Sequence, residues 1–155
     1  MKSNHLKLAL TIISVTILSF SSCSSDDDNN SSDSDLVNQI EDNVESGTWR
    51  ITKFIDSGDD ETNHFNGYNF TFHNSGVLSA SNGTTNYEGI WSVTNSSSND
   101  DNPLDVNFNI FFDLTNDFEE LNDDWHFISE SPTKIELIDI SGGNGGTDYL
   151  TFEKN

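Results

Sequence analysis

The sequence predicts an all-β protein, an eight-stranded antiparallel up-and-down barrel that follows a short N-terminal helix. Apolar and polar residues alternate from Trp49 onward, which gives each strand one dry face and one wet face. Turns rich in Gly, Asn, Asp and Ser separate the alternating runs, so consecutive strands are expected to pair as a meander. Eight such strands can close into a barrel and leave no exposed edge. A two-sheet β-sandwich would give nearly the same pattern and is the alternative.

A helix is expected before the first strand. Its apolar face recurs at helical spacing and consists of Leu36, Val37, Ile40 and Val44. Asp35 could cap the start of this helix, and Gly47 would end it.

The alternating runs that we read as strands are 49–53, 68–73, 77–80, 87–93, 106–113, 125–127, 135–137 and 149–153. Trp49 is expected to plug the end of the barrel that the helix covers. The segment 115–122 interrupts the rhythm and is expected to form a helical turn that places Phe118 and Leu121 inward. Three large apolar side chains fall on the strand face opposite to the main apolar one and are expected on the outer surface: Phe111, Ile128 and Ile138.

Residues 1–22 have the pattern of an export signal. Lys2 and Lys7 precede an apolar run at 8–20, which is shorter than the roughly 20 residues that a membrane span needs. The only cysteine follows, and Phe20-Ser21-Ser22-Cys23 resembles a bacterial lipobox. The resemblance implies that Cys23 carries a diacylglycerol and becomes an acylated N-terminus, with palmitate as a typical acyl chain. Two or three such chains would anchor the protein stably, since one alone is marginal. Ordinary secretion with a stray thiol is the alternative.

Residues 23–35 read as an acidic, disordered tether, because Ser, Asp and Asn offer no apolar surface to bury. Its first part, Ser24, Ser25, Asp26, Asp27 and Asp28, resembles the export signal of surface-exposed lipoproteins from Bacteroidetes. The resemblance implies an outer-membrane, lipid-anchored protein that faces the cell exterior, with the periplasmic face as the alternative. Residues 36–155 would then form one domain.

Charge narrows the range of partners. The chain has 27 Asp and Glu against six Lys and Arg, a net charge of −21. Such a field repels phosphate backbones, so nucleic acid is excluded as a partner. Contact with a membrane is expected only through the N-terminal lipid. Cationic partners, divalent ions and neutral ligands stay compatible with the charge.

No motif indicates an enzyme or a resident cofactor. No serine stands in a Gly-x-Ser-x-Gly elbow, and the cysteine is expected to be acylated. His73 and His126 fall on polar strand faces, and they could share a transition metal only if their strands were neighbours. The acidic segments 56–61 and 119–124 could offer oxygen ligands to calcium, but neither matches an EF-hand loop. We therefore expect solvated acidic loops, no cofactor and no metal site.

The wider pattern resembles the lipocalin-like lipoproteins of flavobacteria. The matching stretches, which cover nearly all of 36–155, are Gly47-Thr48-Trp49-Arg50-Ile51, residues 65–72, residues 87–91, residues 120–125 and residues 150–154. That family is largely of unassigned function, so the resemblance implies a barrel more than an activity.

Two functions follow from the predicted barrel. Eight strands enclose a space that side chains fill or that holds one small ligand. We expect the second case, a non-enzymatic barrel in which Tyr68, Trp91 and Phe108 line an open cup for a small apolar or carbohydrate ligand. The alternative is a filled barrel that acts as an accessory to another outer-membrane protein.

Overall fold

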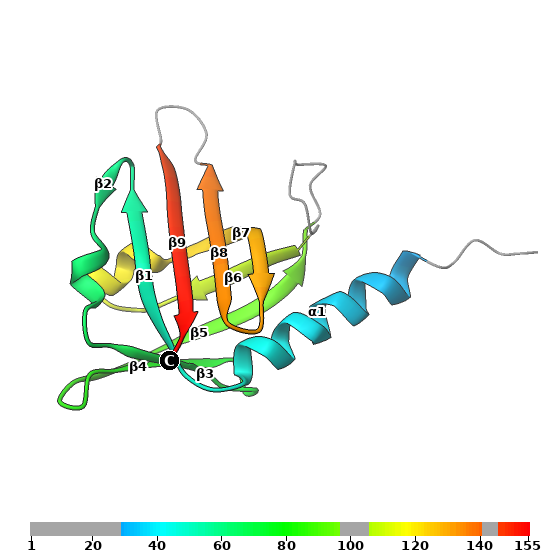
Figure 1. The fold of residues 1–155 in the computed structure, drawn as a ribbon, viewed down its shortest axis with the longest axis horizontal. Coiled ribbons are helices and arrows are strands. Elements are labelled where there is room, and N and C mark those ends of the chain that lie inside the picture. The colour runs from blue at the N-terminus through cyan, green and yellow to red at the C-terminus, as the bar shows by residue number, and fades with distance from the viewer. Residues whose placement is uncertain (1–28, 97–105, 141–145) are drawn as a thin grey trace, which may run out of the picture.

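The computed structural model describes residues 29–96, 106–140 and 146–155 (Figure 1). In chain order its elements are α1 (Asn29–Glu45), β1 (Trp49–Asp56), β2 (Asp59–Asp60), the 3₁₀ turn η1 (Thr62–Phe65), β3 (Asn69–Phe72), β4 (Val77–Ser81), β5 (Asn86–Asn95), β6 (Val106–Phe111), the 3₁₀ turn η2 (Asp117–Leu121), β7 (Asp123–Ser131), β8 (Lys134–Ile140) and β9 (Thr147–Lys154).

The strands form a closed antiparallel barrel. Each strand from β3 to β8 pairs with the next in the chain, and β1 pairs with both β3 and β9. The two-residue β2 pairs only with β1, so eight strands make up the wall. The predicted up-and-down barrel is confirmed, and the sandwich alternative is wrong because the β1–β9 ladder closes the sheet on itself.

The helix is longer than predicted. It begins at Asn29, so residues 29–35, which we expected in a disordered tether, are helical. Once the apolar face at 36–44 fixes a helix on the barrel, each added turn needs no new nucleus, and even Ser and Asn can extend it. The end is as predicted, with Glu45 as the last helical residue and Gly47 at a positive φ of 101°.

The barrel interior is filled with aromatic and aliphatic side chains. All three Trp and nine of the 11 Phe are buried, and they form one continuous cluster with buried Ile, Leu, Val and Ala side chains. Every wall strand contributes at least one side chain to this cluster. The rings meet mainly edge to face, at centroid distances between 4.8 and 6.4 Å, which is the preferred aromatic geometry.

Helical segments cover both ends of the barrel. The helix α1 precedes β1, whereas η1 precedes β3, which runs antiparallel to β1, and η2 follows β6, which runs parallel to β1. Therefore α1 lies at one end of the barrel and the two 3₁₀ turns lie at the other. At the first end Trp49 is fully buried and its indole Nε1 donates to the carbonyl of Val44 at 2.8 Å, which confirms the predicted plug. At the second end Phe118 and Leu121 of η2 point inward, as predicted.

Two elements at that second end were not predicted. The β1–β2 hairpin turns at Ser57 and Gly58, which both have positive φ, and η1 follows directly. Phe65 of η1 packs on Phe118 of η2 at a ring distance of 5.3 Å. The two 3₁₀ turns are therefore held against each other by the core.

Candidate functional site

The predicted ligand cup is not assembled as one site. Trp91 and Phe108 pack at a ring distance of 6.0 Å, and both also contact Phe72. Tyr68 lies at the η2 end instead, where its ring contacts Tyr87 at 6.0 Å and Phe118 at 5.0 Å. The structure brings two of the three residues together and leaves the third in another cluster.

Trp91 and Phe108 belong to the hydrophobic core, and Tyr68 packs against it. Phe108 is fully buried, Trp91 is 6% exposed and its indole Nε1 donates to the carbonyl of His73 at 3.0 Å. A ligand on Phe108 would have to displace neighbouring rings, because packed interiors leave few voids. A binding role for the three residues stays a prediction, and the packing favours the filled-barrel alternative.

The predicted anchor lies outside the described residues. This holds for Cys23 and for the acidic signal at Ser24–Asp28. Among the residues that the structure describes, no helix has the length and apolarity required to cross a bilayer. Acylation and export therefore stay predictions.

The outer wall of the barrel carries an apolar row that we call the outer-wall patch, consisting of Val77, Ile90 and Phe111. The three residues face one another across β4, β5 and β6, since Ile90 pairs with Val77 on one side and with Phe111 on the other. Ile90 is 59% exposed, Phe111 is 50% exposed and Val77 is half-buried. The outward orientation predicted for Phe111 is confirmed. So is that of Ile128, which is 47% exposed on β7.

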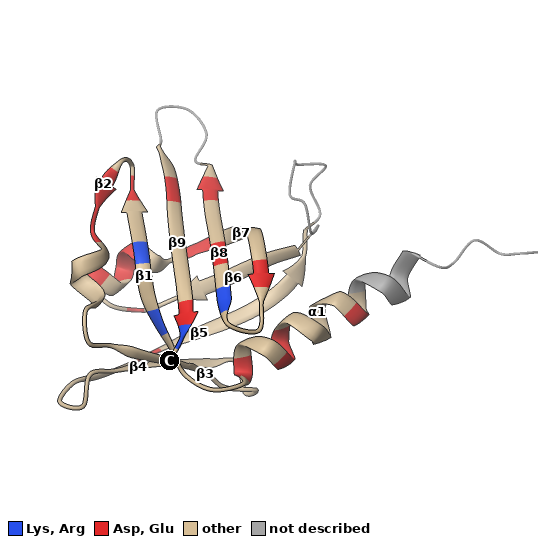
Figure 2. Cartoon of the chain, in the orientation of Figure 1, with Lys and Arg blue, Asp and Glu red and all other residues tan. Residues whose placement is uncertain are grey.

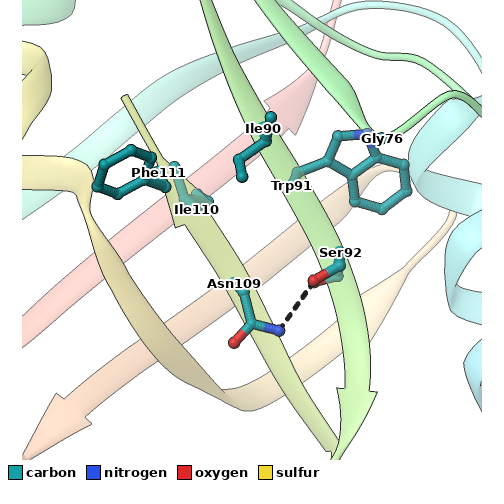
Figure 3. Close-up of a pocket in the computed structure, with 7 residues that line it drawn as sticks. All are labelled: Gly76, Ile90, Trp91, Ser92, Asn109, Ile110 and Phe111. Carbon is teal, nitrogen blue, oxygen red and sulfur yellow. Dashed lines mark hydrogen bonds between the residues drawn. The ribbon is translucent and has the colours of Figure 1, made fainter. Parts of the chain in front are cut away.

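A hollow of about 320 Å³ adjoins this patch (Figure 3). Its lining consists of Gly76, Ile90, Trp91, Ser92, Asn109, Ile110 and Phe111. One side is polar, where the Asn109 amide donates to the Ser92 hydroxyl at 3.2 Å and to the Thr94 hydroxyl at 3.0 Å. The other side is the apolar surface of Ile90 and Phe111, which Figure 3 shows lying next to each other on neighbouring strands.

The chemistry of this hollow is that of a binding surface. None of its lining residues is ionisable, although the chain has 27 acidic residues. It offers apolar contact with one amide and one hydroxyl at the margin. That combination can bind and orient an apolar group, and no acid or base among the lining residues could activate the Ser92 hydroxyl.

The two strand histidines do not meet. The His73 imidazole Nε2 lies 3.1 Å from the Ser79 hydroxyl, next to β3 and β4. His126 lies on β7, between β6 and β8. Because β3 and β7 are not neighbours, the structure excludes the shared metal site that we considered for this pair.

The two acidic segments, in contrast, do meet, and a third histidine lies between them. We call this group the His64 cluster; it consists of His64, Glu61, Asp117 and Glu120. The His64 Nδ1 atom lies 3.8 Å from Glu61 Oε2, 4.0 Å from Asp117 Oδ2 and 3.7 Å from Glu120 Oε2. Burial raises the pKa of Glu120 to about 7, and the adjacent Glu61 carboxylate adds to the shift.

Sequence reasoning considered each acidic segment alone and missed this cluster. A signal was present, because both segments sit beside short turns that carry an inward-facing Phe. What the sequence did not reveal is that Phe65 and Phe118 pack together and so bring the two acidic segments to one end of the barrel.

Comparison with known proteins does not assign this chain to a family. No protein-family model matches the chain, and no curated protein matches it. The chain is similar to the crystal structure of a DUF4847 family protein from Bacteroides vulgatus ATCC 8482, with a TM-score of 0.47 and 20% sequence identity. The match covers 75% of this chain and 97% of that one. A likeness at this level carries no inference about family or function.

Proposed function

We propose that this protein is a non-enzymatic lipoprotein of the cell envelope that binds another outer-membrane protein through its outer-wall patch. In this proposal acylated Cys23 anchors it to the outer membrane, and the acidic residues that follow direct it to the cell exterior. One observation carries the binding part: the aromatic interior is filled, while Ile90 and Phe111 lie exposed side by side on the wall.

The patch is an unusual place for large apolar side chains. Most outward positions on these strands are polar, and Ser92, Asn109 and Asn107 continue the same faces of β5 and β6. Contiguous apolar surface beside a hollow is typical of interaction sites. Since no charged group lines the hollow, the group that enters it is expected to be an apolar side chain of the partner.

The exposure of the patch favours a protein over a small molecule. Small-molecule sites usually bury most of the ligand surface, whereas here the two main apolar side chains are at least half exposed. Covering the exposed halves of Ile90 and Phe111 would contribute about 2–3 kcal/mol in total, taking roughly 1.5–3 kcal/mol for full burial of each. Replacing either by Ser is therefore expected to weaken binding about tenfold.

A second candidate function rests on the volume of the hollow. About 320 Å³ is at the lower end of the range for small-ligand pockets. The Asn109 amide and Ser92 hydroxyl at its margin are groups that could orient a small apolar or carbohydrate ligand. This is the ligand-binding function that the sequence predicted, moved from the interior to the outer wall.

Photo-crosslinking in intact cells tests the main proposal. A photoreactive phenylalanine at position 111 is compared with the same residue at position 128, which is similarly exposed but lies on β7, away from the patch. We expect a discrete adduct with one outer-membrane protein from position 111 only, lost in Ile90→Ser. Equal adducts from both positions, or none from 111, would contradict the proposal. A small molecule that co-purifies with the full chain and is lost in Ile90→Ser would instead support the second candidate.

The anchor and the export signal are tested separately. Cys23→Ala is expected to abolish labelling by a radioactive or clickable fatty acid and to release the protein from membranes, and continued labelling would refute acylation at this residue. Protease added to intact cells is expected to digest the exposed domain. Resistance until the outer membrane is breached would place the protein on the periplasmic side.

A further inference from the structure

We propose that the His64 cluster binds one divalent transition-metal ion, of the class of Zn²⁺ or Mn²⁺. The first three ligands would be Glu61, His64 and Glu120, with Asp117 beside them. The proposal concerns the end of the barrel that η1 and η2 close, and it is independent of the outer-wall patch.

The ligand atoms converge from two turns that are far apart in the chain. The candidate oxygen and nitrogen atoms of Glu61, His64 and Glu120 lie within 4.8 Å of one another. Two donor atoms at about 2.05 Å from a tetrahedral zinc are about 3.3 Å apart. The distances of 3.7 and 3.8 Å from His64 Nδ1 exceed this by a few tenths of an ångström, and the widest of the three separations, at most 4.8 Å, exceeds it by up to about 1.5 Å. The carboxylate side chains would therefore rotate inward to complete the coordination.

The two turns are held in place beneath the cluster. Phe65 packs on Phe118 edge to face at 5.3 Å, and both rings are buried. The His64 backbone amide donates to the Glu61 carbonyl at 3.0 Å, and the Asn116 side chain caps η2 by accepting from the Phe118 amide at 3.1 Å. Ligands carried on supported backbone lose less entropy when they bind an ion.

The cluster contains a buried oxygen that lacks a donor. Glu61 Oε2 is shielded from solvent and has no hydrogen-bond partner, and His64 Nδ1 lies 3.8 Å from it. A buried carboxylate oxygen without a donor or cation is costly. A cation bound between this oxygen, the imidazole and the Glu120 carboxylate would supply the missing partner.

The basic side chains of the described residues are engaged elsewhere, on β1, β8 and β9 (Figure 2). Their partners are Glu153 for Arg50, Glu136 for Lys134, the Tyr149 ring for Lys53 and the Trp49 ring for Lys154. Among the ion pairs of the described residues, the three carboxylates of the cluster therefore face the His64 imidazole and no Lys or Arg. A divalent ion supplies the charge that the surroundings lack.

The donor set indicates which metal. Imidazole nitrogen suits zinc, copper, iron and nickel, whereas calcium and magnesium prefer all-oxygen sites. One imidazole with two or three carboxylates is compatible with Zn²⁺ or Mn²⁺ and disfavours Ca²⁺. A bound ion would link η1 to η2 and is expected to raise the thermal stability of the barrel.

The test uses the full chain in mild detergent, produced without a histidine tag and stripped with a chelator. Zn²⁺, Mn²⁺ and Ca²⁺ are titrated separately by calorimetry, and the melting temperature is measured with and without each ion. We expect one Zn²⁺ or Mn²⁺ per chain, a higher melting temperature and at least tenfold weaker binding of Ca²⁺. His64→Gln and Glu120→Gln are each expected to weaken binding of Zn²⁺ at least tenfold.

Matched controls separate a site from general attraction to an acidic protein. Glu119→Gln makes the same charge change on the neighbouring residue of η2, outside the cluster, and His126→Gln removes a histidine from β7. Both are expected to leave affinity unchanged. Failure to bind Zn²⁺ and Mn²⁺, or a loss in Glu119→Gln equal to that in Glu120→Gln, would overturn the proposal. If His64→Gln does not fold, two other measurements test metal binding by the cluster. One is the Zn²⁺ affinity of Glu120→Gln, and the other is the modulation of the Mn²⁺ electron-spin signal by an imidazole nitrogen.

Discussion

Replacing Phe118 by Ala tests whether η2 is an integral part of the core. This side chain is 3% exposed. Its ring contacts five others at centroid distances from 4.8 to 6.0 Å, those of Phe65, Tyr68, Phe70, Tyr87 and Phe112. Removing it would leave a cavity between the wall and both 3₁₀ turns.

The expected loss is large relative to the total stability. Truncation of a buried Phe to Ala costs about 3–5 kcal/mol, and domains of this size have total stabilities of roughly 5–15 kcal/mol. Phe111→Ala is the matched control, because it deletes the same side chain from a position that is 50% exposed. We expect it to cost about 1 kcal/mol or less.

Urea denaturation of the full chain, followed by tryptophan fluorescence, measures both effects. All three Trp are buried, so their emission reports unfolding of the barrel. With a slope of about 2 kcal/mol per molar urea, Phe118→Ala is expected to lower the midpoint by about 2 M. A shift no larger than that of Phe111→Ala would refute the view that η2 seals this end. If the Ala variant does not fold, Phe118→Leu is expected to give a smaller shift in the same direction.

Two further changes test other parts of the wall. Gly89→Ala would place a Cβ 2.5 Å from the Phe111 carbonyl oxygen and 2.7 Å from the Phe112 ring. Urea denaturation is expected to show a free energy of unfolding lower by about 1–3 kcal/mol. A variant as stable as the parent would show that the strands can separate there without cost. Burial raises the pKa of Asp123 to about 6, and the Asp139 carboxylate adds to the shift. The folded state therefore binds a proton on Asp123 more tightly than the unfolded state does. The protonated carboxyl stabilises the fold below about pH 4, and this contribution to the free energy of unfolding is lost as the pH rises through 6. Asp123→Asn is therefore expected to be more stable than the parent by about 1 kcal/mol at pH 7.5, allowing for solvent screening, and equally stable at pH 4. An equal gain at both pH values would contradict the raised pKa of Asp123.

Alternation of apolar and polar residues was sufficient to predict the barrel. A one-residue slip would expose every buried ring, so the pattern determined which face of strands such as β3 and β6 points inward. Helical spacing gave the inner face of α1, but its start could not be predicted, because residues 29–35 have no apolar face of their own. The η1 turn was missed for the same reason, since four residues with one inward Phe show no period.

The candidate sites were harder to predict. The sequence placed Phe111 on the outside, but it did not reveal that Ile90 lies directly opposite it, which depends on the β5–β6 register. The interior cup was predicted from the space that eight strands enclose, and the number of strands does not distinguish a hollow barrel from a filled one. The His64 cluster depends on a contact between residues more than 50 positions apart, which no local pattern records.

The pairing of β1 with β9 has a consequence for how the molecule is made. Arg50 and Glu153 form an ion pair across this seam at 3.1 Å, although they are 103 positions apart in the chain. The barrel cannot close until the strand at 147–154 has been synthesised, and until then β1 and β8 each have an unpaired edge that other chains could bind. Such a long-range closing step slows folding, so the interval before it is when this protein is most exposed to aggregation, and a chaperone would be most useful there.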